Sequence, residues 1–167
     1  MITHDYWGKI DERDGVITLD CDEQKAKGKG GDGIGSALCF MEWDGTPLHL
    51  TVERTRVWRP EPWADLWFVA TEHGEPAEWM RQPWPMRYLR LWGGGCEVGL
   101  SLGPAKEDQR IVVTSAPSVQ SRHRHYKLSW SAGALHVGIP QGTYSVPSPV
   151  RELGLYAEGC VLEVAVE

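Results

Sequence analysis

The C-terminal third of the chain, residues 122–167, alternates apolar and polar side chains with a period of two. The alternation runs through residues 126–130 and, after a short turn, through residues 135–139. A period of two is the spacing of side chains on one face of a β-strand, so these two runs predict a hairpin. Two further segments, residues 153–155 and 162–166, predict two more strands. We therefore expect an antiparallel sheet with one buried face.

Similar patterns occur upstream. Residues 48–56 alternate clearly, with Leu48, Leu50 and Val52 on the side expected to be buried. Residues 64–70 are apolar on both sides, which is typical of a central strand. The other predicted strands are residues 16–21, 37–43, 88–92, 96–102 and 111–116. The whole chain then holds about ten strands and no clear helix.

Glycine and proline punctuate these short runs. The chain has 19 Gly and 11 Pro in 167 residues, which favours a sheet protein over a helix bundle. No strand–helix–strand alternation is visible, which argues against a nucleotide-binding parallel sheet. We predict an all-β fold, a two-sheet antiparallel β-sandwich of the jelly-roll type, with residues 1–167 as one domain.

Charge and apolar content exclude several kinds of partner. The formal net charge is -6 and no basic cluster is present, so nucleic acid is not expected as a partner. No apolar run approaches the roughly 20 residues that cross a bilayer, and the charged N-terminus does not resemble a signal peptide. The four Cys form no C-x-x-C pair. We expect a cytoplasmic protein with free, buried thiols and no membrane partner.

Two short motifs suggest cofactors only weakly. Gly28, Gly30 and Gly33 match G-x-G-x-x-G, but a dinucleotide motif needs a strand directly before it and a helix directly after it. We interpret this segment as a mobile polar loop. His123 and His125 offer two of the four ligands that a zinc site usually has, and an ordinary hydrogen-bonding role is favoured. The sequence therefore predicts no cofactor and no metal.

The order of features in residues 45–167 resembles the concanavalin A-like lectin/glucanase superfamily. The residues that carry the resemblance are the strand His125-Tyr126-Lys127-Leu128-Ser129-Trp130, the apolar strand from Gly133 to Ile139, the link from Pro147 to Pro149, Leu153 to Tyr156, and Val161 to Val166. The resemblance implies a jelly roll whose concave sheet typically meets carbohydrate.

The resemblance does not bring a catalytic motif with it. The E-x-D-x-x-E strand of laminarinase-type glycosidases is absent from the sequence. Glu53, Arg54 and Arg56 do not match the R-x-E-x-R strand of alginate-lyase-type relatives, and neither their Gln-x-His strand nor a legume-lectin metal loop is recognisable. No functional residue can be transferred from the family, so the candidate site comes from the strand pattern.

Eight residues are predicted to point outward from the middle strands. They are His49, Glu53, Trp67, Tyr88, Arg90, Trp92, Glu97 and His136. If these strands share one sheet, the residues form a groove with an aromatic floor and polar edges. Such a groove suits a sugar, because aromatic rings stack on its apolar face and charged groups bind its hydroxyls. The alternative is that Trp67 and Trp92 belong to the core.

Glu53 and Glu97 are candidates for a general acid and base. Glycoside cleavage needs two carboxylates about 5–10 Å apart across the scissile bond. The two glutamates come from different predicted strands, so the sequence does not determine their separation.

Three functions remain open at this point. The first is a carbohydrate-binding β-sandwich. The second is an enzyme acting on a small molecule, such as a hydrolase, lyase or cyclase, in which the loop at residues 71–87 covers the concavity. The third is a protein-interaction module that uses the aromatic loop. The sequence does not determine the oligomeric state.

Overall fold

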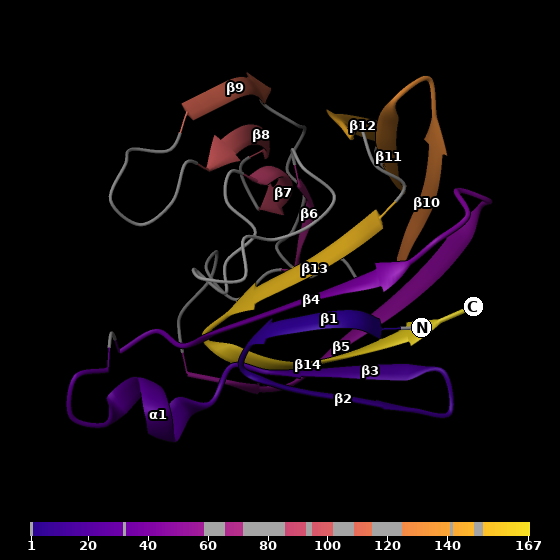
Figure 1. The fold of residues 1–167 in the computed structure, drawn as a ribbon. Coiled ribbons are helices and arrows are strands. Elements are labelled where there is room, and N and C mark those ends of the chain that lie inside the picture. Colours follow the sequence, from indigo (N-terminus) through magenta and orange to yellow (C-terminus); the bar gives the residue numbers. More distant parts are fainter. Residues whose placement is uncertain are drawn as a thin grey trace.

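The chain folds into two antiparallel β-sheets packed as a sandwich (Figure 1). The computed structural model describes residues 2–31, 33–58, 66–71, 86–92, 95–101, 109–114, 125–140, 142–148 and 152–167. These residues form fourteen strands and one short helix. The predicted all-β, two-sheet antiparallel sandwich is confirmed.

Each sheet has seven strands, and all paired neighbours are antiparallel. Sheet A has the order β1 (Ile2–Trp7), β4 (Ser36–Glu42), β13 (Glu152–Glu158), β6 (Trp67–Thr71), β7 (Met86–Trp92), β8 (Gly95–Ser101) and β9 (Gln109–Thr114). Sheet B has the order β12 (Gly142–Pro147), β11 (Ala134–Ile139), β10 (His125–Ser131), β5 (Leu48–Val57), β14 (Cys160–Val166), β3 (Val16–Asp20) and β2 (Lys9–Arg13).

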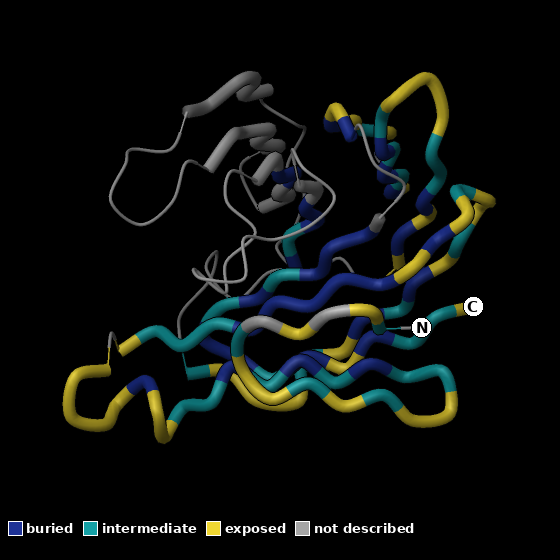
Figure 2. Tube along the Cα trace, in the orientation of Figure 1, coloured by how far each residue is buried: buried dark blue, intermediate teal, exposed yellow. Residues whose placement is uncertain are grey.

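The main core lies between the sheets and takes alternate side chains from the strands in the middle of each sheet. Figure 2 shows the buried segments concentrated along β4 and β13 in the middle of the molecule. Sheet A contributes Ala37, Cys39, Met41, Phe68, Leu89, Leu153, Leu155 and Ala157 to this core. Sheet B contributes Ile17, Leu19, Leu50, Val52, Tyr126, Leu128, Leu135, Val137, Val146, Leu162 and Val164. Burial of apolar surface on this scale is the dominant favourable term in folding.

Most predicted strands are confirmed where the structure describes them. The alternating segment at residues 48–56 lies within β5, in which Leu50 and Val52 are buried and His49 is exposed. The doubly apolar run at residues 64–70 overlaps β6 from Trp67 to Ala70, and β6 has three strands on either side of it in sheet A. Its central position explains why neither face needs polar residues.

Four elements were not predicted from the sequence. Strands β1, β2 and β12 occupy segments that we interpreted as a polar start and a connecting link, and all three lie at sheet edges. Edge strands tolerate polar residues on both sides, so β1 and β2 carry little periodic signal. β12 does alternate, with Tyr144 and Val146 towards the core, but it lies in a Gly- and Pro-rich segment that we interpreted as a link. The helix α1 (Glu23–Lys27) has five residues, too few for a helical period, and is capped by the Asp22 side chain, which accepts from the Lys25 amide. None of the helices that the structure describes is long and apolar enough to span a bilayer.

The strands of the C-terminal third do not belong to one sheet, and that expectation was wrong. β10, β11, β12 and β14 lie in sheet B, whereas β13 lies in sheet A between β4 and β6. A tight turn at Gly159, with φ of 64°, separates β13 from β14. The chain therefore changes sheets there. Alternation shows which side of a strand is buried but not which sheet the strand joins.

The described cysteines agree with the expectation of buried thiols. Cys21, Cys39 and Cys160 are buried thiols that form no disulfide among the described residues. Burial is the main reason that the pKa of Cys39 is raised to about 12, with smaller contributions from the charges of Asp5 and Glu12. The Cys39 thiol therefore stays protonated near neutral pH and behaves as a small core residue.

Two strand glycines provide a matched test of the packing. A methyl group at Gly154 would lie 2.2 Å from Val69 Cγ2 and 2.6 Å from Phe40 Cε1, whereas at Gly138 the nearest atoms are 3.5 Å away. We expect Gly154→Ala to destabilise the protein by about 1–3 kcal/mol through overpacking. Gly138→Ala should be neutral or stabilising by up to about 1 kcal/mol. Urea unfolding of both variants measures the difference, and equal stabilities would contradict this description of β13.

Candidate functional site

The eight predicted site residues divide between the two sheets. Trp67, Tyr88, Arg90, Trp92 and Glu97 lie on strands of sheet A, and His49, Glu53 and His136 lie on strands of sheet B. The alternate residues on β5 and β11 pack in the core, so His49, Glu53 and His136 face outward from sheet B. They cannot share a groove with Trp67 and Tyr88. The single groove expected from the sequence does not form.

Trp67 and Tyr88 belong to an aromatic cluster on the face of sheet A that points away from the main core. We call the cluster of Trp7, Tyr156, Trp67 and Tyr88 the aromatic face. Ring centroids are 6.1 Å apart between Trp7 and Tyr156, 5.2 Å between Tyr156 and Trp67, and 5.3 Å between Trp67 and Tyr88. Distances of this size are those of favourable aromatic pairs. The cluster therefore forms a continuous aromatic surface across β1, β13, β6 and β7.

Strand register explains why these rings meet. Leu38 lies opposite both Trp7 and Tyr156, and Tyr156 lies opposite Trp67, so one row of side chains crosses four strands. The next row runs Phe40, Gly154, Val69 and Tyr88. Side chains directly opposite each other on antiparallel strands are close enough to pack. The two rows thus place the rings of β1, β13, β6 and β7 on one side of the sheet.

The aromatic face lies on the side of sheet A that points away from sheet B. Figure 1 shows sheet A rising from β4 and β13 through β6 towards β7, β8 and β9, with β14, β5 and β3 beneath β4 and β13. Leu38, Phe40, Val69 and Tyr88 are buried there, while Trp7, Trp67 and Tyr156 are partly exposed. A surface with a buried apolar floor and partly exposed rings can stack against a flat ligand.

A hydrogen bond adds polar chemistry to this surface. The Tyr156 hydroxyl donates to Oε1 of Glu158, two positions along β13. Burial, followed by the negative charge of Glu158, raises the pKa of Tyr156 well above its ordinary value. The phenol is therefore neutral at physiological pH and donates its one O–H to Glu158, while its oxygen and the carboxylate keep further acceptor capacity.

Several predicted residues take positions close to this cluster. Arg90 is in register with Trp67 on one side and with Glu97 on the other. Trp92 is the last residue of β7 and lies opposite Gly95 of β8. Residues 72–85, most of the predicted lid, lie outside the described residues.

Trp7 and Tyr156 were not among the residues predicted from the sequence. Tyr156 falls on the same side of the LGLY strand as Gly154, away from the core-facing Leu153 and Leu155. That alternation was the available signal for an outward-facing ring. Trp7 lies on the edge strand β1, which carries no clear alternation.

The structure does not bring the candidate acid and base together. Glu53 is exposed on sheet B, directly opposite Glu163 of β14. Glu97 is on β8 of sheet A. Carboxylates that cleave a glycosidic bond have to flank the same ligand. The pairing of Glu53 with Glu97 is therefore not supported by their positions.

His49 and His136 lie together on the outer face of sheet B instead. His49 is exposed on β5, and His136 is partly buried on β11. His136 Nε2 is 3.0 Å from the Ser131 hydroxyl, and its Nδ1 is 2.6 Å from the Ser145 hydroxyl. His125 Nδ1 is 3.3 Å from the Thr51 hydroxyl, while His123 lies outside the described residues. No group of three or more metal-ligating side chains occurs among the described residues.

The glycine motif has the wrong order of elements for a dinucleotide site. Helix α1 comes before Gly28, Gly30 and Gly33, and strand β4 follows them. A dinucleotide motif requires the reverse, with the helix beginning at the glycines so that its amides face the pyrophosphate. The structure therefore agrees with the interpretation that this segment is not a phosphate cradle.

No protein-family model matches the sequence, and no curated protein matches it. Among solved structures, the chain is similar to LamAcat from Zobellia galactanivorans, with TM-score 0.46 and 12% identity over 92% of this chain and 76% of that chain. It is also similar to an endo-β-galactosidase from Clostridium perfringens that releases GlcNAcα1-4Gal, with TM-score 0.45 and 9% identity over 98% of this chain and 57% of that chain.

A third similar structure is a family 7 alginate lyase, A1-II′, in complex with its product, with TM-score 0.39 and 12% identity over 93% of this chain and 78% of that chain. The all-β, two-sheet antiparallel sandwich expected from the sequence is shown by the two sheets described above. Identities and TM-scores of this size do not transfer a function, which has to be inferred from the geometry.

The buried phenol of Tyr156 predicts a loss of stability in alkali. The pKa of Tyr156 is raised in the folded state, so the unfolded chain releases this proton first, at its ordinary pKa of about 10. Stability should therefore decrease as the pH rises above about 10. Tyr156→Phe removes the titrating group, and its melting temperature should fall less steeply with pH than that of the wild type. Equal pH dependence in the two proteins would contradict the raised pKa.

Proposed function

We propose that the protein binds carbohydrate on the aromatic face of sheet A. The observation that carries the proposal is the row of Trp7, Tyr156 and Trp67, which come from three strands and are each partly exposed. The C–H groups of a pyranose ring form an apolar face of the size of an aromatic side chain. Stacking against a ring buries that face at little entropic cost, because the rings already pack against one another.

Glu158 and Tyr156 are the polar anchors in this proposal. A carboxylate that already accepts one hydrogen bond from Tyr156 can accept another from a sugar hydroxyl. Arg90 is in register with Trp67, and we propose it, with Trp92 and Glu97, as a further contact at the β7–β8 end of the sheet. A few polar groups at the edge of an apolar surface would orient the sugar.

The proposal is confined to binding because Glu158, the carboxylate that Tyr156 bonds, lies far from Glu42 and Glu152 at the other end of the same two strands. Glu42 pairs with Glu152, and Glu158 pairs with Ser36, at opposite ends of β4 and β13. From position 152 to position 158 there are six residue steps, or about 20 Å at the rise of a β-strand. An acid and base pair needs a separation of about 5–10 Å, so Glu42 and Glu158 cannot act together on one glycosidic bond.

Substitution of Trp67 tests this proposal. We expect Trp67→Leu to weaken the binding of a neutral oligosaccharide by about tenfold, because the stacking contact is lost. Trp67→Phe keeps a ring and should retain part of the affinity. Titration of neutral oligosaccharides, followed by tryptophan fluorescence and melting temperature, measures both effects, since a ligand of the native state raises the melting temperature.

Trp58 provides the matched control. It is a partly buried tryptophan whose Nε1 donates to the Ile34 carbonyl at 2.8 Å, and it is not part of the aromatic face. Trp58→Leu should leave oligosaccharide affinity unchanged. Undiminished affinity in folded Trp67→Leu and Trp7→Leu, or the absence of any response in the wild-type protein, would refute the proposal.

A further inference from the structure

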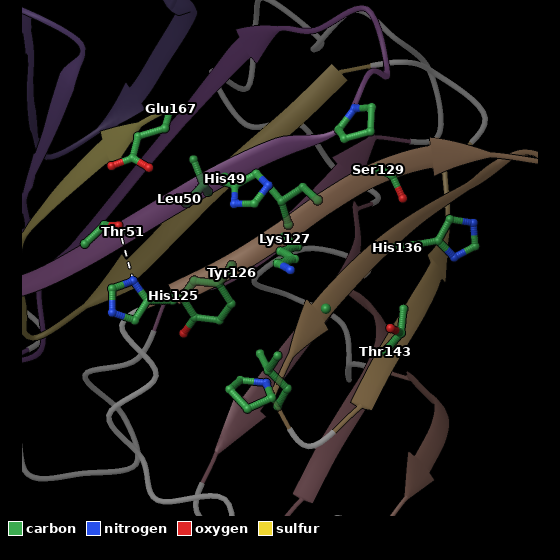
Figure 3. A pocket seen from close by; sticks show the side chains of 15 residues that line it. His49, Leu50, Thr51, His125, Tyr126, Lys127, Ser129, His136, Thr143 and Glu167 are labelled. Atoms are coloured by element: carbon green, nitrogen blue, oxygen red, sulfur yellow. Dashed lines mark hydrogen bonds between the residues drawn. The ribbon is translucent and has the colours of Figure 1, made fainter.

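A second candidate site lies on the outer face of sheet B, on the other side of the sandwich from the aromatic face. It is a cavity of about 490 Å³ lined by β5, β10, β11 and β12. This volume falls within the range of about 300–1,000 Å³ that is usual for small-molecule sites. Figure 3 shows His49, Lys127, His136 and Thr143 around it. We call these four residues and Gly138 the polar hollow.

Strand register places most of the polar hollow in one row. Lys127 of β10 lies opposite His49 of β5 on one side and opposite Gly138 of β11 on the other. Gly138 in turn lies opposite Thr143 of β12. Opposite side chains on neighbouring antiparallel strands begin about 4.5–5.5 Å apart. A ligand resting over Gly138 would therefore contact Lys127 and Thr143 together.

The missing side chain at Gly138 opens this space. Its φ is outside the left-handed region, so the backbone conformation does not require glycine. A Cβ atom there would meet Lys127 Cβ and the Lys127 carbonyl oxygen at 3.5 Å and Thr143 Oγ1 at 3.7 Å, which are ordinary contacts. The other four residues of the polar hollow carry side chains, which form its walls. Gly138 therefore forms the floor of the hollow, and neither packing nor backbone conformation requires a glycine there.

His136 forms a wall of fixed orientation. It lies opposite Ser129 on β10 and Ser145 on β12, and both of its ring nitrogens are within hydrogen-bond distance of serine hydroxyls, those of Ser131 and Ser145. Two partners hold the ring in one orientation. Part of the site is thus preorganised, which lowers the entropic cost of binding.

The charge over the hollow comes from Lys127. It is exposed and makes no ion pair with the residues that the structure describes. The one carboxylate lining the cavity is Glu167, which exchanges backbone hydrogen bonds with His49 at 3.1 and 2.9 Å. Glu167 is therefore two strand spacings from Lys127, about 10 Å. Over such a distance in salt solution it opposes an anion at Lys127 only weakly.

We propose that the polar hollow binds a hydroxylated small molecule that carries an oxyanion, either a carboxylate or a phosphate ester. The Lys127 ammonium pairs with the oxyanion, which is a charge-assisted interaction. The Thr143 hydroxyl and the exposed His49 ring bind the ligand's hydroxyls, and Gly138 admits the body of the ligand close to the backbone. A neutral sugar lacks the charged contact and binds this site poorly.

Two variants and three probes test the proposal. The probes are glucuronate, glucose 6-phosphate and glucose, and binding is followed by calorimetry and by the NMR shifts of the histidine rings. Lys127→Met keeps the length of the side chain and should weaken the binding of the oxyanionic probe at least about tenfold. Gly138→Val fills the floor and should abolish binding. If Gly138→Val fails to fold, Gly138→Ala replaces it, because its methyl group meets only ordinary contacts.

The controls separate this site from general charge and from the aromatic face. Lys9→Met removes an exposed lysine at the opposite edge of the same sheet and should have no effect. Trp67→Leu should also leave the oxyanion affinity unchanged, so the two proposals can fail separately. Preference for glucuronate or for glucose 6-phosphate identifies the carboxylate or the phosphate as the recognised group. No binding of either probe, or equal binding by wild type, Lys127→Met and Gly138→Val, would overturn the proposal.

Discussion

The pairing of β13 with β4 on one side and β6 on the other is the constraint on which both faces of sheet A depend. β13 directs Leu155 into the main core and Tyr156 to the opposite face. Since the side-chain period of a strand is two, a register slip of one residue would exchange these two sets. Gly154 adds to this constraint, because only a residue without Cβ fits between Phe40 and Val69.

The two outer surfaces of the sandwich differ in chemistry because their strands differ in burial. In the middle of sheet A, Leu38, Phe40 and Val69 are buried although they face away from the main core. That surface is therefore apolar and aromatic. The outer face of sheet B around Lys127 is exposed or only partly buried, so it carries hydroxyls, imidazoles and an ammonium group. Two kinds of ligand chemistry are thus available on opposite sides of one fold.

The sequence allowed the orientation of most strands to be predicted but not their partners. Alternation correctly placed Leu50 and Val52 inside and His49 outside, because that property is local to one strand. The division of the candidate site residues was not predictable in this way. His136 and Trp67 were both predicted to face outward, yet they belong to different sheets, since pairing depends on contacts between segments distant in the chain. The edge strand β1 was missed for a different reason, because exposed edges do not require apolar residues.

Gly154 and Gly138 show why residue type alone could not reveal either surface. Both are glycines within strands, and neither has a φ that demands glycine. At Gly154 the missing side chain is replaced by Phe40 and Val69, which close over it and support the aromatic face. At Gly138 a methyl group would meet Lys127 and Thr143 only at ordinary contact distance, and the space remains open. The absence of a side chain thus gives a packed surface in sheet A and a hollow in sheet B. The difference depends on the cross-strand neighbours, which are apolar and buried at Gly154 but polar and exposed at Gly138.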